Sequence, residues 1–386
     1  MILSHKIEMN PSKEQKEAMA RACGVARYTW NWALEKWGEE YKAGGKPREL
    51  ALKKRWNQEK PDWVYLSPKG ANQRPFVDLG RAFSSFFSHR ARYPRFKRKG
   101  RHDSFYVEND KLLILGNQVR LPKIGWAELT EGLRLQGKIM GGVVSREADR
   151  WFIAVQVDVG DYRKARDADG VVGVDLGVKD AVVWSTGERV SGPKPLKDAL
   201  RTLKRRQQGH SRKVKGSNNR RKSTVRLARL HWRIKNQRND WLHKVTTQLC
   251  RENQTVVIED LNVAGMLKNH KLARSISDIG FGEFRRQLGY KSKIFGTELL
   301  VADRFFPSTK LCWACGRIKD MPLSERVYRC ECGYVADRDL NAARNLSTLG
   351  YRGINACGEE GSGSPWRVKP TSMKQELEQH LCALER

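Results

Sequence analysis

The sequence has few acidic residues relative to its basic ones and no long hydrophobic run. Its 386 residues include 74 Lys and Arg against 43 Asp and Glu, which leaves a formal net charge of +31. No stretch approaches eighteen consecutive apolar residues, so we expect no membrane-spanning helix. Lys6 and Glu8 interrupt the first ten residues, MILSHKIEMN, before an apolar signal-peptide core can form. We therefore expect a cytoplasmic, prokaryotic, nucleoid-associated protein without a membrane partner.

Several catalytic motifs are also absent. The eight histidines show neither an H-E-x-x-H motif nor a paired spacing, and the sequence contains no G-x-S-x-G and no Walker loop. Acyl transfer and NTP hydrolysis are therefore unsupported. The positive excess instead indicates a partner with a phosphate backbone. An anionic membrane surface, or a basic enzyme that is merely soluble, is the alternative.

The most basic part of the chain is segment 201–240, which contains fifteen Lys and Arg and one acidic residue, Asp240. Such a run is often only a solvated helical hairpin. One face still carries Val225, Leu230 and Ile234 for packing, which favours a helical wall that follows phosphates. The candidate phosphate contacts are Lys204, Arg205, Arg206, Arg220, Arg221, Lys222 and Arg226.

Hydrophobic periodicity divides the chain into three regions. Residues 1–9 alternate like a strand, and helical patterns dominate up to about residue 90, with Asn10 predicted to cap the first helix. From Ser104 onward, short segments separated by turn residues predict a small barrel or meander. These segments are SFYVEND, KLLILG, QVRLP, LRLQG, GGVVSRE and WFIAVQVDV. Beyond Val171, buried strands alternate with helices, which predicts an α/β sheet.

Four of the eight cysteines lie in one short segment. Cys312-Trp-Ala-Cys315 and Cys330-Glu-Cys332 form a C-x2-C…C-x-C set around a loop of fourteen residues. This spacing is typical of a structural zinc site, and an iron–sulfur cluster or a redox dithiol is the alternative. A glycine follows each pair and allows backbone amides to reach the sulfurs.

Acidic side chains follow two predicted strands. Asp175 ends VVGVD and Glu259 ends TVVIE, and the carboxyl ends of strands in an α/β sheet are where ligands usually bind. A single acid in such a place is more often a turn or cap residue. With Asp337 and Asp339, however, there are four candidates for the roughly three converging carboxylates that two-metal hydrolysis of a phosphodiester requires. Mg²⁺ prefers such oxygen ligands.

The chain resembles the TnpB family over nearly its whole length. TnpB proteins are RNA-guided nucleases of IS200/IS605-type and IS607-type insertion sequences and are relatives of Cas12 effectors. The resemblance rests on GVDLGVKD, VVIEDLNVAGMLKN, KLARSISDIGFGEFRRQL, FFPSTKLCWACG, YRCECGYVADRDLNAARN and the tail beginning ACGEEGSG.

The resemblance implies a multidomain α+β and α/β fold. A helical recognition lobe would be inserted in a small wedge-like β-barrel, and an RNase H-like RuvC α/β domain with an inserted zinc-ribbon-like module would follow. The implied domains are 1–10 with 104–165 (barrel), 11–103 (helical lobe), 166–305 with 334–386 (RuvC-like) and 306–333 (zinc module, binding target nucleic acid).

The resemblance also implies the roles of the site residues. Asp175, Glu259 and Asp339 match the RuvC carboxylates, which would bind Mg²⁺ or Mn²⁺. The zinc module of the family is matched by Cys312, Cys315, Cys330 and Cys332, which would bind one structural Zn²⁺. Asp339 is preferred to Asp337 because two such residues on a helix differ by about 200° in direction.

A programmable endonuclease is the function that this resemblance implies. The protein would bind a guide RNA of the omega type from its own locus and pair it with double-stranded DNA beside a short adjacent motif. It would cut both strands at one site, which promotes transposon retention, and a separate transposase would be encoded nearby. The alternatives are a nuclease-inactive regulator, a transposase or accessory DNA-binding protein, and a zinc protein that only binds RNA.

Overall fold

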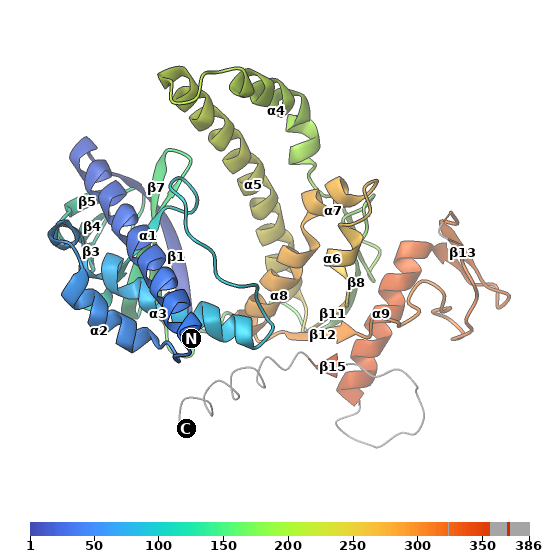
Figure 1. Cartoon of the computed structure of the whole chain (residues 1–386). Helices are drawn as coiled ribbons and strands as arrows, with labels where there is room; N and C mark the ends of the chain where they lie inside the picture. The colour runs from blue at the N-terminus through green and yellow to red at the C-terminus, as the bar shows by residue number, and fades with distance from the viewer. Residues whose placement is uncertain (323, 356–368, 371–386) are drawn as a thin grey trace. The chain divides into compact units, whose positions relative to one another are not determined.

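The structure, a computed structural model, divides into two compact units that are described separately (Figure 1). The first comprises Met1–Tyr162 and Lys215–Trp232, and the second comprises Arg163–Val214 and the described chain from Arg233 onward. No helix in the described part of the chain is both long and apolar enough to cross a membrane. The described residues are 1–322, 324–355 and 369–370.

A seven-stranded antiparallel sheet forms the centre of the first unit, in the order β2-β6-β7-β1-β5-β4-β3. β1 (Ile2–Asn10) pairs along its length with β7 (Arg150–Asp158), and its last two residues also pair with β5. The other strands are β2 (Ser104–Glu108), β3 (Leu113–Leu115), β4 (Gln118–Leu121), β5 (Gly125–Leu129) and β6 (Lys138–Glu147). The strand order ends at β2 and β3, and closure into a barrel stays a prediction.

Helices that follow β1 pack on this sheet and share one hydrophobic core with it. They are α1 (Lys13–Lys42), α2 (Glu49–Glu59), the 3-10 helix η1 (Asp62–Leu66) and α3 (Lys69–Phe87). Met19 and Phe76 from the helices and Ile7 and Ile153 from the strands belong to this core. The implied separation of the helical lobe from the barrel likewise stays a prediction.

The cap of α1 is Ser12, so the prediction of Asn10 is wrong. The Ser12 hydroxyl accepts the amide of Gln15, and the Gln15 side chain accepts the amide of Ser12 at 2.9 Å. This capping box satisfies two donors at once, whereas Asn10 is engaged in β1.

The second unit is built on a six-stranded sheet in the order β10-β9-β8-β11-β12-β15. β8 (Val171–Asp175), β11 (Thr255–Glu259) and β12 (Glu298–Ala302) are parallel. Antiparallel strands continue the sheet on both sides, namely β9 (Val182–Trp184), β10 (Arg189–Val190) and β15 (Lys369–Pro370). An antiparallel meander joined to parallel strands through helices is the RNase H-like arrangement, so the predicted α/β fold is confirmed.

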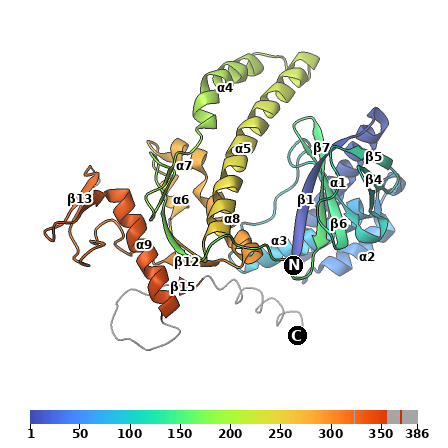
Figure 2. The same ribbon diagram turned by 180° about the vertical axis from the view of Figure 1, so that it is seen from behind.

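Helices cover both faces of this sheet (Figures 1 and 2). α9 (Arg338–Asn355) lies on one face, and α8 (Phe281–Phe295) lies on the other with the C-terminal half of α5. α5 (Asn218–Glu252) contributes its residues up to Trp232 to the first unit and the rest to the second. The shorter helices of the second unit are α4 (Pro195–Ser211), α6 (Val263–Met266) and α7 (Ala273–Ile279).

Gly173 in the middle of β8 allows α9 to approach the sheet. A Cβ at this position would overlap the carbonyl oxygen of Ala343 and the amide nitrogen of Ser347, well inside the 3.0 Å that Cβ atoms keep from other heavy atoms. The backbone of α9 therefore lies directly against β8. This contact determines where the first turn of α9 stands relative to the end of the strand.

Candidate functional site

Two carboxylates lie at the same edge of the sheet in the second unit. Asp175 ends β8 and Glu259 ends β11, and these strands are parallel neighbours in which Val174 lies opposite Ile258. Neighbouring strands lie about 4.8 Å apart, and residues at matching positions point to the same face. Asp175 and Glu259, which follow Val174 and Ile258, therefore lie close together at this edge. Asp175 is only 8 % exposed.

α9 adds a third carboxylate, Asp339 in its first turn. Burial raises the pKa of Asp175 well above its usual range, and the neighbouring charges of Glu259 and Asp339 raise it further. Burial also raises the pKa of Glu259, while the Ser308 hydroxyl, which donates to Glu259 Oε1, lowers it. The structure thus brings together the three carboxylates that the sequence singled out.

Asp337 has a different environment. It ends the strand before α9, where its Oδ1 accepts the amides of Asp339 at 3.0 Å and Leu340 at 3.3 Å and so caps the helix. Its Oδ1 also pairs with Arg189 Nη2 at 3.1 Å. The expectation that both aspartates share a helix is wrong, because α9 begins at Arg338. The choice of Asp339 stays a prediction, which the capping role of Asp337 now supports.

Two asparagines of α9 hold the loop that contacts Glu259. Asn345 Nδ2 donates to the carbonyls of Ser308 and Leu311, both at 2.7 Å, and Asn341 Nδ2 donates to Leu311 O at 2.8 Å. Both asparagines are buried. A continuous chain of hydrogen bonds therefore runs from α9 through Ser308 to the carboxylate of Glu259. Our sequence reasoning missed it, although two asparagines four residues apart on one helical face were its signal.

The four cysteines converge as predicted. Two precede the hairpin of β13 (Val327–Arg329) and β14 (Val335–Asp337), and two lie in its turn. All four sulfurs lie within 4.8 Å of one another, with 3.7 Å between Cys312 and Cys332 and 3.6 Å between Cys315 and Cys330. Sulfurs bound tetrahedrally at about 2.3 Å would lie roughly 3.8 Å apart, so the cluster can hold a metal ion.

Both cysteine turns depend on glycine and on backbone amides. Gly316 (φ 73°) and Gly333 (φ 87°) adopt the left-handed conformation that favours glycine. Their amides donate to the carbonyls of Cys312 at 2.9 Å and Cys330 at 3.1 Å. The amide of Cys332 lowers the pKa of Cys330 to about 7, which favours the thiolate that binds metal. The short C-x-C pair is therefore closed in the same way as the C-x2-C pair.

The cysteine module packs against the helix that carries Asp339. The Arg344 guanidinium lies 5.0 Å from the centre of the Trp313 ring, and its Nη1 donates to the hydroxyl of Tyr334 at 3.1 Å. The amide of Trp313 donates to Asn341 Oδ1 at 3.3 Å. The module and the carboxylate site are therefore anchored to the same helix.

The carboxylates are spread more widely than the cysteines. Among the described residues, only the four cysteines offer three or more metal-binding atoms within 4.8 Å of one another. A wider set of oxygens suits two ions that stand about 3.5–4 Å apart and share ligands. Burial and the charges of Glu259 and Asp339 raise the pKa of Asp175. Divalent cations would relieve this repulsion, and hard oxygen ligands fit Mg²⁺ or Mn²⁺.

The predicted phosphate contacts are divided between the two units. Lys204, Arg205 and Arg206 lie on α4 in the second unit, and the other four lie on α5 in the first. Six of the seven side chains are exposed, and Arg220 is half-buried. Their contact with nucleic acid stays a prediction.

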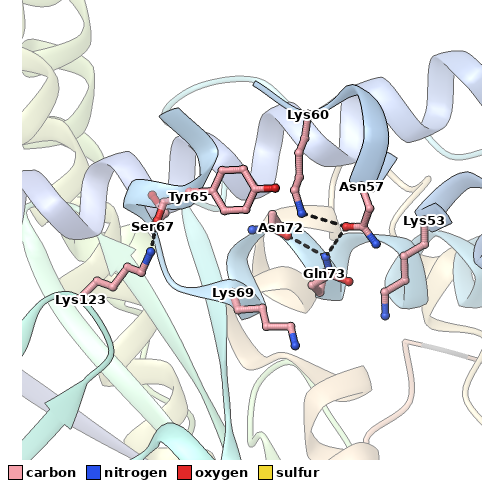
Figure 3. A pocket seen from close by; sticks show the side chains of 9 residues that line it. All are labelled: Lys53, Asn57, Lys60, Tyr65, Ser67, Lys69, Asn72, Gln73 and Lys123. Carbon is pink, nitrogen blue, oxygen red and sulfur yellow. Dashed lines mark hydrogen bonds between the residues drawn. The ribbon is translucent and has the colours of Figure 1, made fainter. Parts of the chain in front are cut away.

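A basic pocket of about 430 Å³ lies in the first unit (Figure 3). Gln73 Nε2 donates to the side-chain oxygens of Asn57 at 3.2 Å and Asn72 at 2.9 Å, and Lys60 Nζ donates to Asn57 Oδ1 at 2.9 Å. Our sequence reasoning missed this pocket because its residues come from separate elements. They are Lys53, Asn57, Lys60, Tyr65, Ser67, Lys69, Asn72, Gln73 and Lys123.

Three family descriptions match parts of the chain. "Probable transposase" matches residues 154–270, "Cas12f1-like, TNB domain" matches 281–346, and "Helix-turn-helix domain" matches 1–46. The segment matched last contains β1 and the whole of α1.

Two bacterial relatives match almost the full length of the chain. The one from Streptomyces pristinaespiralis is 37% identical, covering 99% of this chain and 98% of its own. The one from Escherichia coli K12 is 34% identical, covering 96% and 98%. Both are named "Putative RNA-guided DNA endonuclease", the second with the suffix InsQ.

The fold is also similar to that of a solved structure, described as "Cryo-EM structure of the Cas12f1-sgRNA-target DNA complex". Its TM-score is 0.56 at 13% identity, and the match covers 90% of this chain and 98% of the Cas12f1 chain. At this identity the similarity supports the fold alone.

Proposed function

The chain belongs to the TnpB family, and we propose that it is an RNA-guided DNA endonuclease. Its catalytic residues would be Asp175, Glu259 and Asp339. One observation carries the proposal: the three acids converge at one edge of an RNase H-like sheet. The names of two relatives that match nearly its whole length agree with this activity.

The three carboxylates would hold Mg²⁺ or Mn²⁺ in a RuvC-type site. Bound divalent ions supply an activated water and stabilise the departing 3′ oxygen. The chain itself places Asp175 and Glu259 from adjacent strands and Asp339 from α9, and the Ser308 hydroxyl orients Glu259. Burial excludes bulk water from Asp175, which strengthens its interaction with a cation.

The four cysteines would hold one structural Zn²⁺. Zinc is favoured because four thiolates in two glycine turns match its tetrahedral sulfur sites. The ion would fix the loop between Ser308 and Cys315, which the asparagines of α9 bind from the other side. Zinc would thus support the carboxylate site through this loop and present the module to target nucleic acid.

The partners would be a guide RNA of the omega type from the protein's own locus and double-stranded DNA beside a short adjacent motif. The net charge of +31 suits two nucleic acids. The pocket of Figure 3 suits the adjacent motif, because its lysines can contact phosphates and its amide side chains can both donate to and accept from base edges. Cleavage of the vacated site would promote transposon retention, and a separate transposase encoded nearby would move the element.

The test begins with the RNA that accompanies the protein. The chain is expressed with its flanking locus, the co-purifying RNA is sequenced, and the complex is incubated with plasmids that carry the matching target and a randomised flank. We expect cleavage beside one short motif. The variant Asp175→Asn should bind the same plasmids without cutting them.

Three results would contradict parts of this proposal. Absence of RNA from the locus would refute guided recognition. Binding without cleavage by the wild type would favour a nuclease-inactive regulator. Cleavage by Asp175→Asn at the wild-type rate would show that the acid site does not perform the reaction.

A further inference from the structure

A second basic cavity, of about 140 Å³, lies in the second unit outside the carboxylate site. Val178 belongs to the loop after β8, two lysines stand at the start of α4, and the remaining side chains belong to α7. The lining residues are Val178, Lys194, Lys197, Arg274, Ser275, Asp278 and Ile279.

Three cations surround this cavity. Lys194, Lys197 and Arg274 have exposed side chains, and within the described chain these side chains form no ion pair or hydrogen bond. Asp278 is the one acid in the lining, and its charge is already paired with Arg238 Nη2 at 3.1 Å. The cavity therefore keeps an uncompensated positive charge that suits an anionic ligand.

The walls of the cavity are fixed before any ligand binds. Asp278, which is 2 % exposed, accepts the amides of Leu196 at 3.1 Å and Lys197 at 3.2 Å. This carboxylate of α7 thus caps α4 from a different helix, because it satisfies amides that have no partner within α4. A site whose backbone is already held loses less conformational entropy on binding.

The cavity belongs to the same edge of the sheet as the carboxylates. Val178 follows Asp175 by three residues, and α7 follows Glu259 through the short helix α6. Arg189 fixes the loop after β8, since it pairs with Asp180 at 3.3 Å and with Asp337, the cap of α9, at 3.1 Å. The loop that lines the cavity is therefore attached to two of the elements that carry the catalytic acids.

We propose that this cavity binds a backbone phosphate of the DNA strand that is being cut and so positions that strand on the carboxylates. The inference rests on the proposed function. Two lysines, one arginine and the Ser275 hydroxyl are donors suited to the oxygens of a phosphodiester, and donors that carry charge make the stronger bonds. Lys197 and Arg274 are thus positioning residues, because they would bind the strand at a linkage other than the reacting phosphate.

The experiment replaces the phosphates of the cut strand one at a time by uncharged methylphosphonates, leaving the scissile linkage unchanged. Single-turnover cleavage is measured for the guide-loaded wild type and for Lys197→Ala and Arg274→Ala. At one linkage we expect the replacement to slow the wild type about tenfold, as expected for loss of a charge-assisted contact. At that linkage it should not slow either variant further.

The matched control is Lys293→Ala, which removes an exposed lysine from the last turn of α8 in the same unit. At every linkage, the methylphosphonate should reduce the cleavage rate of this variant by the same factor as that of the wild type. Thermal melting of the three variants checks that they fold. A merely structural effect of Lys197→Ala would not depend on which phosphate is neutral.

The outcomes separate this inference from the proposed function. If the wild type cuts and Lys197→Ala responds to every linkage as Lys293→Ala does, the phosphate site is refuted. A second series places the methylphosphonates in the guide RNA instead. If only this series slows the wild type without slowing Lys197→Ala further, the cavity binds the guide, and the proposal is again refuted. If the wild type does not cut unmodified target, the proposed function itself fails, and this inference fails with it.

Discussion

The cysteine cluster and the carboxylate cluster of the second unit are assembled in different ways. The cysteines come from one segment, 312–332, and their sulfurs lie within 4.8 Å of one another. The carboxylates come from β8, β11 and α9, and burial and mutual repulsion raise the pKa of Asp175. The cysteine site is a product of two local turns. The carboxylate site exists only when the sheet and α9 have packed.

This difference indicates which of the two sites depends on the other. The turns that hold the cysteines are closed by their own amides and glycines. The carboxylate site depends in addition on the loop of Ser308, which lies between α9 and the cysteine module. We therefore expect loss of the metal from the cysteines to disturb the carboxylates, and loss of a carboxylate to leave the cysteines intact.

Removal of the cysteine site should have the largest effect. Structural zinc contributes on the order of 10 kcal/mol to the folding of small zinc modules. Cys312→Ser with Cys332→Ser should abolish zinc binding, measured as metal content per chain, and should increase hydrogen exchange in 306–337. DNA cleavage should be lost as well. Cys23→Ala in the first unit is the control and should keep its zinc. Full cleavage by the zinc-free variant would show that the two sites are independent.

Substitution of single carboxylates tests whether the cysteine site is independent of the carboxylate site. Asp339→Asn should reduce the cleavage rate at least about a hundredfold, because a metal ligand contributes several kcal/mol and 1.36 kcal/mol is a factor of ten. Asp337→Asn keeps an oxygen that can cap α9 and should stay within about tenfold of the wild type. Both should retain zinc. The opposite order of the two rates would show that Asp337 is the ligand.

Gly173→Ala tests whether the packing of α9 creates the carboxylate site. The added Cβ overlaps the backbone of Ala343 and Ser347, and overpacking of this kind destabilises by roughly 1–3 kcal/mol or more. Urea unfolding should show this loss, and cleavage should fall while zinc content stays near one per chain. The control Gly289→Ala on α8 places its Cβ in open space and should stabilise by up to about 1 kcal/mol. Equal stability of the two variants would contradict the close approach of α9.

The same contrast explains what the sequence could predict. Local spacing was sufficient to predict that the four cysteines converge, and hydrophobic runs that end in an acid were sufficient to place Asp175 and Glu259 at strand ends. The roles of these residues stay predictions. The support from Asn341 and Asn345 escaped prediction because it requires a loop distant in sequence to lie beside α9.

Sheet register is another feature that short segments do not encode. The predicted strand LRLQG forms no strand, whereas GWAEL forms β5 because it pairs with β4 and with the end of β1. The wrong prediction of the α1 cap has a different cause. The capping-box pattern of Ser12 followed by Gln15 was readable from the sequence, and Asn10-Pro11 obscured it.

A buried lysine gives the smallest predicted effect, and in contrast to Asp175 its pKa is shifted by burial without a like charge beside it. Lys291, 5 % exposed, lies between α8 and α5, where its Nζ donates to His243 O at 2.7 Å and to the hydroxyls of Thr246 and Thr247 at 2.8 Å. No carboxylate of the described chain pairs with it. Burial lowers the pKa of Lys291 to about 8.

Since the unfolded chain keeps this proton up to about pH 10.4, it binds more protons than the folded chain above pH 8. Stability contributed by this group must therefore rise with pH in that range. Between pH 7.5 and 9.5 the free energy of unfolding of the wild type should rise relative to that of Lys291→Met by on the order of 1–2 kcal/mol. Groups common to both proteins cancel in this difference, which is measured by urea unfolding at each pH. A difference that does not change with pH would mean that Lys291 titrates normally and that burial does not lower its pKa.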